Sequence, residues 1–373
     1  MPRFDISSLP LTDQAALLSG RNMIHTKPIE SAGIPRAALL DGPHGLRMNE
    51  RVFGRSTATC FPPAVAIGSS WDPAVAARMG EAIGREAAAF GVAVVLGPGI
   101  NIKRSVLCGR NFEYYSEDPL LAGTLASAYV RALQEQGPGA CLKHFAANSQ
   151  ETERMRISSD VDERTLREIY LPAFEQVVKE ARPASVMCSY NKINGVYASE
   201  NRWLLTSLLR DEWGFEGAVV SDWGAVNDRV AALEAGLDLQ MPGTGGVDDA
   251  RVLTAVAEGR IPASLVEASS VRVGALIERA PVIADAADGE IDLDAHHDLA
   301  RGLAAECVVL LKNDRAVLPL SPEADVAVIG EFAVNPRYQG GGSSHVTPTR
   351  VSGALDSMRT LSRSVTYCSG NVL

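Results

Sequence analysis

The sequence predicts an α/β fold, a (β/α)8-like TIM barrel, from two features of the chain. Short apolar runs alternate with helical patterns along residues 1–285, and polar residues follow the apolar runs. Strands that alternate with helices form a parallel sheet through right-handed crossovers, so their carboxyl ends meet at one face. A barrel of about 250 residues fits inside this chain with room left over.

The expected strands are apolar throughout, because a parallel strand is covered on both faces. They are residues 37–40, 92–96, 140–142, 184–187, 217–221 and 237–241. Apolar residues at spacings of three and four predict helices over residues 73–90, 120–136, 163–180, 202–213 and 226–235.

Polar side chains follow five of these strands in succession. Asp41 follows the first strand, Asn101 the second, Lys143 and His144 the third, Tyr190 and Asn191 the fourth, and Asp222 with Trp223 the fifth. A single Asp after a strand is typical of a helix cap. Repetition at five strand ends instead predicts one shared pocket, because barrel enzymes carry their sites at this face.

Composition limits the classes of partner. The 373 residues are 46% hydrophobic and 21% charged, and the formal net charge of -10 disfavours nucleic acid and acidic membrane surfaces. We expect a neutral or weakly charged substrate. The amino terminus lacks a signal-peptide pattern and no apolar run is long enough to cross a bilayer, so a cytoplasmic protein is expected.

The six cysteines lie singly, without a Cys-x-x-Cys pair. This spacing predicts reduced thiols, with neither a disulfide framework nor a zinc site. No cofactor or metal is expected.

A composition break at residues 285–298, rich in Ala, Asp and Gly, predicts two domains. We expect a barrel over residues 1–285, a linker over 286–300 and a second α/β domain over 301–373, with a helix at 299–305 and strands at 308–311 and 325–330. At roughly 75 residues, this second domain is expected to be truncated, because a sheet must be buried on both faces. Its Gly-rich loop, Gln339 to His345, lacks the Gly-Lys-Ser/Thr ending of a phosphate loop.

A series of ordered motifs carries a family resemblance. They are Asp41-Gly-Pro-His-Gly-Leu-Arg, Gly97-Pro-Gly-Ile-Asn-Ile-Lys-Arg, Cys108-Gly-Arg-Asn-Phe-Glu-Tyr-Tyr-Ser-Glu-Asp-Pro, Lys143-His-Phe, Met187-Cys-Ser-Tyr-Asn-Lys-Ile-Asn-Gly, Val220-Ser-Asp-Trp-Gly and, later, Glu306-Cys-Val-Val-Leu-Leu-Lys-Asn-Asp. Over about the whole chain, this series resembles glycoside hydrolase family 3 of the β-glucosidase type.

The resemblance implies a barrel followed by an α/β sandwich domain, and retaining hydrolysis of terminal non-reducing β-D-glycosides. It places the nucleophile at Asp222. It also implies that the hydroxyls of the terminal sugar are bound by Asp41, Arg110, Lys143 and His144, that Trp223 stacks on a sugar face, and that Tyr190 lies close to the nucleophile.

The chemistry of retention agrees with that assignment. Two carboxyl groups about 5 Å apart are needed, one to attack the anomeric carbon and one to protonate the leaving oxygen. The attacking Asp must be ionised, so it needs donors and cations nearby. Lys143, His144 and Arg110 supply them.

Each residue also has a structural alternative. Arg110 and Glu113 could pair in a surface turn, Asp41 could cap a helix, Lys143 and His144 could form a solvated strand end, and Trp223 could belong to the core. Agreement at matched strand ends favours the shared site over these alternatives.

The second carboxyl group, the acid/base, is where this chain differs from one branch of the family that it resembles. The β-N-acetylglucosaminidase branch of the resembling family supplies its acid/base from an Asp-x-His loop after Lys-His-Phe, whereas this chain continues Ala-Ala-Asn-Ser-Gln-Glu151-Thr-Glu153-Arg154. We expect Glu151 and Glu153 to orient neighbouring cations. In the β-glucosidase branch the acid/base is a Glu of the second domain, which the resemblance places outside this chain.

Three functions are compatible with the sequence. The first is a β-glycosidase completed by a missing C-terminal sandwich region or a complementary subunit. The second is a non-catalytic sugar-binding barrel. The third is an unrelated phosphate-binding barrel enzyme, for which Met241-Pro-Gly-Thr-Gly-Gly is a weak candidate site.

Overall fold

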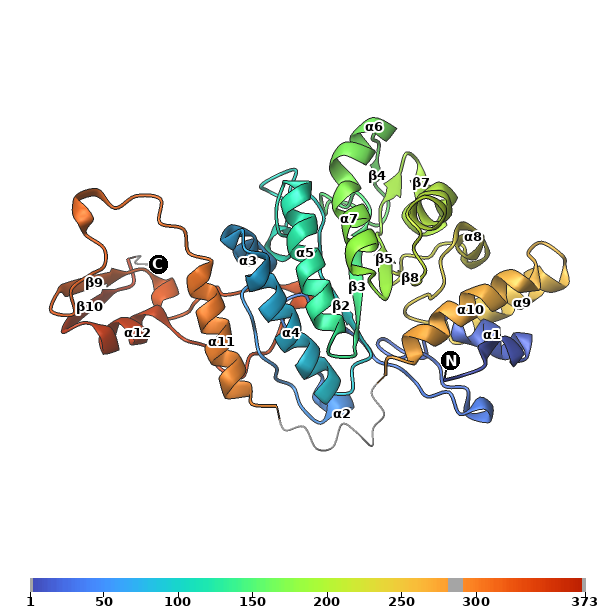
Figure 1. Ribbon diagram of the computed structural model, residues 1–373, viewed down its shortest axis with the longest axis horizontal. Coiled ribbons are helices and arrows are strands. Elements are labelled where there is room, and N and C mark those ends of the chain that lie inside the picture. Colours follow the sequence, from blue (N-terminus) through green and yellow to red (C-terminus); the bar gives the residue numbers. More distant parts are fainter. Residues whose placement is uncertain (1–2, 281–290, 371–373) are drawn as a thin grey trace.

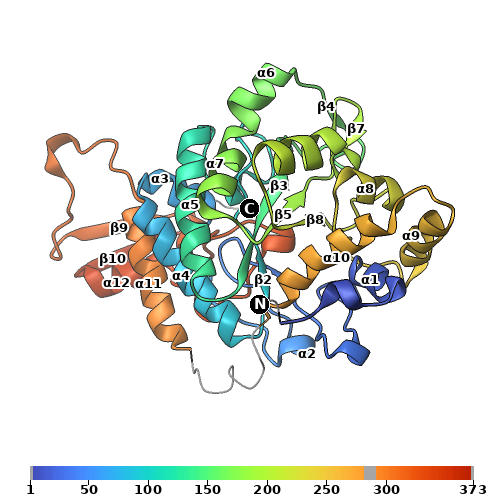
Figure 2. The same cartoon turned by 45° about the vertical axis from the view of Figure 1, so that its right-hand side comes forward.

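The computed structural model describes residues 3–280 and 291–370. It consists of a large α/β body and a smaller lobe at one end, with helix α11 (Leu293–Glu306) between them in both views (Figures 1 and 2). The expected domain boundary at residue 285 and the first residues of the expected linker lie outside the described residues.

The large body is built on a parallel sheet with the strand order β1-β2-β3-β5-β8. These strands are β1 (Leu39–Asp41), β2 (Val94–Leu96), β3 (Gly139–Phe145), β5 (Ser185–Cys188) and β8 (Ala218–Ser221). Almost all of their residues are buried, as expected for parallel strands covered on both sides. The predicted α/β barrel fold is confirmed.

Isolated β-bridges extend the wall of the barrel beyond β8. Leu239 pairs with Val220 and Gln240 with Ser19, both in parallel, and antiparallel bridges then join Gly20 to Thr26 and His25 to Ala38. The wall thus returns to β1, where the amide of Leu39 donates to the carbonyl of Ile24 at 2.8 Å. The predicted strand at 237–241 is therefore reduced to isolated bridges.

Helices cover the outside of the sheet (Figure 1). Those that follow the strands are α4 (Pro73–Ala89), α5 (Pro119–Gln134), α7 (Pro172–Ala181), a π-helical segment (Trp203–Glu212) and α8 (Arg229–Ala235). The helix predicted over 163–180 is divided into α6 (Glu163–Thr165), a π-helical turn (Leu166–Tyr170) and α7. The boundary between the π-helical turn and α7 falls at Pro172, which has no N–H to continue the ladder of hydrogen bonds.

Several elements were not predicted from the sequence. They are α1 (Leu11–Leu17), α2 (Glu50–Phe53), α3 (Ala64–Ser70), α9 (Val247–Ala257), α10 (Ala263–Ile277), short 3-10 turns, and a small sheet of β4 (Ser158–Ser159), β6 (Lys192–Ile193) and β7 (Val196–Tyr197). Helices α1, α9 and α10 lie together beyond α8 at the end of the body opposite the small lobe (Figure 1).

The small lobe contains a parallel pair, β9 (Asp325–Ile329) with β10 (Ser364–Cys368), and helix α12 (Ala354–Leu361). Helix α11 attaches it to α4, where His296 Nδ1 lies 2.7 Å from the buried Glu86 Oε1. The strand predicted at 308–311 is wrong: this run pairs with no strand among the described residues, and its side chains are 58–90% exposed. An apolar run becomes a strand only where a neighbouring strand takes its hydrogen bonds.

The Gly-rich segment of the small lobe returns to the barrel. Pro348 forms a parallel bridge with Ala58, and the amide of Ala58 donates to the carbonyl of Thr347 at 3.1 Å. This return brings residues 341–344 to the carboxyl ends of the strands.

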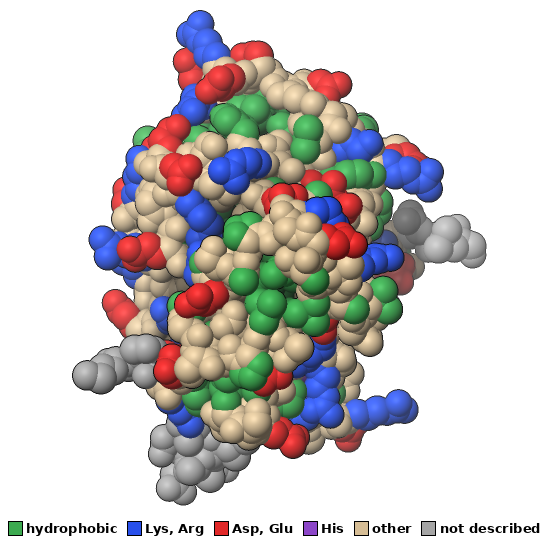
Figure 3. Space-filling model, turned by 90° about the vertical axis from the view of Figure 1, so that its right-hand side faces the viewer, with side chains coloured by type: hydrophobic (Ala, Val, Ile, Leu, Met, Phe, Trp, Pro, Cys, Tyr) green, Lys and Arg blue, Asp and Glu red, His purple; other side chains and the backbone are tan. Residues whose placement is uncertain are grey.

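On the face shown in Figure 3, acidic and basic side chains are interspersed around hydrophobic ones. This pattern differs from the concentrated positive charge of a nucleic-acid-binding face. Within residues 3–280 and 291–370, no helix has both the length and the apolar character needed to cross a membrane.

Candidate active site

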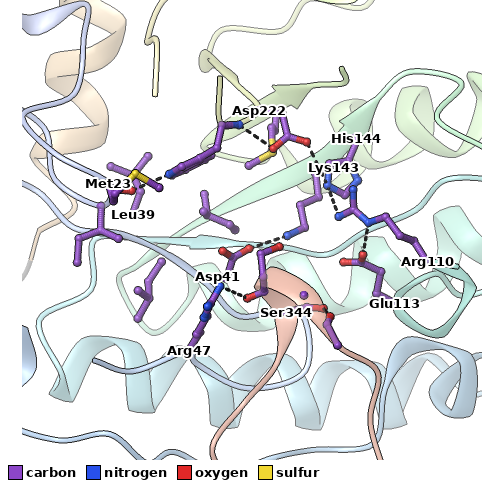
Figure 4. A pocket seen from close by; sticks show the side chains of 18 of the residues that line it. Met23, Leu39, Asp41, Arg47, Arg110, Glu113, Lys143, His144, Asp222 and Ser344 are labelled. Atoms are coloured by element: carbon purple, nitrogen blue, oxygen red, sulfur yellow. Dashed lines mark hydrogen bonds and ion pairs between the residues drawn. The ribbon is translucent and has the colours of Figure 1, made fainter. Parts of the chain in front are cut away.

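A cavity of about 790 Å³ opens at the carboxyl ends of the strands. All seven residues predicted for the site line it: Asp41, Arg110, Lys143, His144, Tyr190, Asp222 and Trp223. Figure 4 shows the polar ends of Asp41, Arg110, Lys143, His144 and Asp222 directed toward a common space, with Met23 and Leu39 on the opposite side. The tertiary structure therefore brings the predicted residues together.

Lys143 and Asp41 form an ion pair across the strand ends. Asp41 is the last residue of β1, and its Oδ1 accepts a hydrogen bond from Lys143 Nζ at 3.1 Å. The Lys143 side chain is 1% exposed and that of Asp41 is 22% exposed. Neither side chain is a helix cap or a solvated strand end, so the structural alternatives for this pair do not hold.

His144 is held as a neutral imidazole. Arg110 Nη2 lies 2.8 Å from His144 Nε2 and, because a guanidinium can only donate, Nε2 must accept. The ring proton is therefore on Nδ1, 3.2 Å from the hydroxyl of Tyr114. Burial, followed by the charges of Arg110 and Lys143, keeps the pKa of His144 well below its ordinary value.

The backbone of His144 is fixed by Asn101 from the loop after β2. The Asn101 side chain accepts from the His144 amide and donates to its carbonyl, both at 2.8 Å. This pairing explains why a polar residue follows the buried strand β2.

Asp222 directly follows β8 and is almost fully buried. Its Oδ1 accepts from the amide of Trp223 at 2.7 Å, and its Oδ2 has no hydrogen-bond partner among the described residues. His144 Nε2 is 3.7 Å from that Oδ2. Burial raises the pKa of Asp222 above its ordinary value, although Arg110, the Trp223 amide, Lys143 and the Tyr190 hydroxyl act to lower it.

Trp223 and Tyr190 are fixed around the carboxylate by backbone acceptors. The Tyr190 hydroxyl donates to the carbonyl of Trp223 at 3.1 Å, and the indole Nε1 donates to the carbonyl of Met23 at 2.6 Å. Trp223 is half-buried: it packs on the core and also lines the cavity. One face of an aromatic ring is therefore held in a defined orientation beside Asp222.

Two protein-family models match the sequence. The model described as "Glycosyl hydrolase family 3 N terminal domain" matches residues 10–276, and the one described as "Glycosyl hydrolase family 3 C-terminal domain" matches residues 308–367. The chain belongs to glycoside hydrolase family 3.

Individual family members are similar over nearly the whole chain. "Thermostable beta-glucosidase B" of Acetivibrio thermocellus is 51% identical over 352 residues, which are 93% of this chain and 46% of that protein. An "Exo-alpha-(1->6)-L-arabinopyranosidase" of Bifidobacterium breve is 47% identical over 369 residues, 95% of this chain and 48% of that protein.

Solved structures of the family superpose closely. The Bifidobacterium adolescentis GH3 beta-glucosidase has a TM-score of 0.92 at 46% identity, covering 100% of this chain and 54% of that one. Beta-glucosidase 3B from Thermotoga neapolitana in complex with alpha-D-glucose has a TM-score of 0.91 at 37% identity, covering 97% and 54%. The chain spans about half the length of the relatives that it matches.

The cavity of this family 3 chain also includes residues beyond the seven predicted from the sequence. Arg154 lies over the Tyr190 ring at 4.6 Å from its centroid, and Glu151 Oε2 accepts from Arg154 Nη1 at 2.9 Å. Glu151 thus orients a cation, as expected, whereas the Glu153 pair with Arg156 is exposed. Arg154 could have been found from its place in the loop after Lys143-His144.

The small lobe also contributes to the cavity. Gly341, Gly342, Ser343 and Ser344 line it, and Arg47 Nη1 donates to the carbonyl of Ser343 at 3.4 Å. No local pattern in the sequence joins this loop to the barrel. Among the described residues, no group of three or more His, Cys, Asp or Glu side chains is arranged to hold a metal ion.

Proposed function

We propose that this chain forms the barrel of a retaining exo-β-glycosidase that acts on terminal non-reducing β-D-glucosides or related glycosides. In the proposed reaction Asp222 Oδ2 attacks the anomeric carbon, the leaving oxygen takes a proton from a separate acid, and water then releases the sugar from the covalent glycosyl-Asp222.

The main support for Asp222 as nucleophile is its unpartnered oxygen. Oδ1 is occupied by the Trp223 amide, which fixes the carboxylate, while Oδ2 remains available and lies near two cations, Arg110 and Lys143. A charged oxygen that is buried without a partner is costly to a fold. Its retention fits an atom that forms a bond during the reaction.

The polar residues around Asp222 suit a sugar. Asp41, Lys143 and Arg110 offer a charged acceptor and charged donors, which bind adjacent hydroxyls more strongly than neutral groups do, and the neutral His144 would contribute beside Arg110. Trp223 would stack on the apolar face of the ring, and Tyr190 would lie close to the nucleophile.

We infer that the acid/base Glu is supplied from outside these 373 residues. The other carboxylates of the cavity are each engaged by a cation: Asp41 by Lys143, Glu113 by Arg110 and Glu151 by Arg154. A general acid must instead carry a proton that it can transfer.

The exposed apolar residues of the small lobe support a further polypeptide. Val308, Val309, Leu310 and Leu311 are 78%, 58%, 61% and 90% exposed, and the relatives are about twice as long as this chain. A C-terminal sandwich region, in the same polypeptide or as a complementary subunit, would cover this segment and bring the acid.

The nucleophile is tested by incubation with 2,4-dinitrophenyl 2-deoxy-2-fluoro-β-D-glucoside, followed by peptide mass spectrometry. We expect the fluoroglucosyl group on Asp222 and no labelling of Asp222→Ala. Label on another carboxylate would overturn the assignment. Matching xyloside and α-L-arabinopyranoside reagents would establish the sugar.

The missing acid is tested by the choice of leaving group. Dinitrophenolate departs without protonation, so the chain is expected to release it from a β-glucoside. Hydrolysis of the glycosyl-Asp222 should then be slow, and hydrolysis of cellobiose should be negligible, because both steps need the missing Glu. Addition of the sandwich region of a relative should restore cellobiose hydrolysis if the pieces assemble. Efficient cellobiose hydrolysis by the chain alone would make Glu151, Glu153 or Glu113 the acid. Sugar binding without any labelling would support a non-catalytic barrel instead.

A further inference from the structure

Glu113 is a buried carboxylate in the cavity wall. It ends the 3-10 turn Asn111–Glu113, its side chain is 2% exposed, and its Oε1 accepts a hydrogen bond from Arg110 Nε at 2.5 Å. Figure 4 shows this carboxylate beside Arg110, on the side of the cavity that faces Lys143 and Asp41. Glu113 therefore belongs to the same wall as the predicted sugar-binding residues.

The second carboxylate oxygen of Glu113, Oε2, contributes no hydrogen bond to the described part of the fold. Oε2 of Glu113 is buried and has no hydrogen-bond partner among the described residues. Although burial by itself raises the pKa of Glu113, Arg110 and Lys143 lower it more, so the carboxyl group is ionised and can only accept. A simple structural ion pair would not need to leave a charged oxygen unsatisfied beside a cavity.

A sugar hydroxyl can donate the hydrogen bond that Glu113 Oε2 lacks. A hydroxyl donates one hydrogen bond and accepts others, and at Glu113 an acceptor, Oε2, stands next to a donor, the Arg110 guanidinium. The Asp41–Lys143 pair repeats the same arrangement on the neighbouring strand ends.

Building on the proposed function, we propose that Glu113 Oε2 accepts a hydrogen bond from one hydroxyl of the terminal sugar while Oε1 holds Arg110 in place. Glu113 is thus a sugar-binding residue that sets specificity, as well as the partner that orients Arg110. A sugar that lacks the matching hydroxyl loses this bond and leaves Oε2 buried without a partner.

The test compares 2,4-dinitrophenyl β-D-glucoside with its 3-deoxy, 4-deoxy and 6-deoxy analogues in single-turnover release of dinitrophenolate. In the unaltered chain, loss of the matching hydroxyl is expected to slow release by about ten- to a hundredfold. In Glu113→Gln, which keeps the size of the side chain, the same deletion should cost less than about threefold, on the same reasoning. The other deletions should cost the same in both proteins.

Glu212→Gln is the matched control, because Glu212 also pairs with an arginine, Arg167, but on the exposed surface. It should leave the deoxy pattern unchanged. If Glu113→Gln slows release from every substrate by one common factor, Glu113 only positions Arg110 and the proposal is refuted. No release by the unaltered chain would instead refute the proposed function.

A crystal structure of the unaltered chain with D-glucose gives an answer that needs no variant. We expect a sugar hydroxyl within about 3.2 Å of Glu113 Oε2. Bound glucose whose hydroxyls all lie beyond hydrogen-bond reach of that oxygen would overturn the proposal.

Discussion

Replacement of Lys143 by methionine tests the proposed sugar site in a way that separates binding from folding. Lys143 is 1% exposed and its Nζ donates to Asp41 Oδ1 at 3.1 Å. Methionine has a similar length and no branch, so the side chain can keep its path along β3 while the charge and the donors are lost.

The expected loss follows from the removal of one charged hydrogen bond. Such a bond contributes about 1.5–3 kcal/mol, which corresponds to a roughly 10- to 150-fold weaker affinity for a sugar ligand. The effect on folding should be smaller than the about 3–5 kcal/mol typical of a broken buried pair, because water reaches the half-buried Asp41 that remains.

Isothermal titration with D-glucono-1,5-lactam, a neutral sugar analogue, measures the affinity, and thermal unfolding followed by circular dichroism measures stability. Lys179→Met is the control, because Lys179 pairs with Glu175 on the exposed surface of α7. A folded Lys143→Met variant that binds the lactam as tightly as the unaltered chain would show that this lysine does not contact the sugar.

Three further predictions concern the nucleophile, its neighbour Tyr190 and the packing of helix α3. Tyr190→Phe removes a hydroxyl that lowers the pKa of Asp222, so the acid limb of labelling by the fluoroglucoside should move to higher pH; an unmoved limb would contradict this. Asp222→Asn should raise the melting temperature at pH 7. Because the folded pKa of Asp222 is raised, its ionised form costs stability above that pKa, and the advantage of Asn should vanish as the pH falls below about 4. Gly68→Ala should destabilise the chain by roughly 1–3 kcal/mol in urea unfolding, since the added Cβ would lie 2.2 Å from the carbonyl oxygen of Tyr115. Gly302→Ala, with open space around its Cβ in α11, should instead be neutral or stabilising by up to about 1 kcal/mol.

The sequence predicted the elements whose environment is uniform. Strands β1, β2, β3, β5 and β8 were found within a few residues of their bounds, because a strand covered on both faces needs apolar residues at every position. Helices α4 and α5 were found because one face of each is buried, which places apolar residues at spacings of three and four. Polar residues at the ends of β1, β3, β5 and β8 line the cavity, whereas Asn101 after β2 instead holds the backbone of His144.

Neighbouring segments decided the rest. Residues 308–311 have the composition of a strand and yet are exposed and pair with no strand in the described part of the chain, and residues 237–241 form only isolated bridges. Whether an apolar run becomes a strand depends on hydrogen-bond partners elsewhere in the chain, which local composition does not encode.

The site divides in the same way. The sequence by itself determined which side chains are available at the strand ends, including Asp222, Lys143 and Asp41, because their order along the chain follows the order of the strands. Only the tertiary structure decided which atoms remain free: within residues 3–280 and 291–370, Oδ2 of Asp222 and Oε2 of Glu113 are buried without hydrogen-bond partners, and Arg110 makes Nε2 of the neutral His144 an acceptor. Protonation and hydrogen-bond satisfaction depend on distances of a few ångströms between residues far apart in the sequence, and folding alone sets those distances.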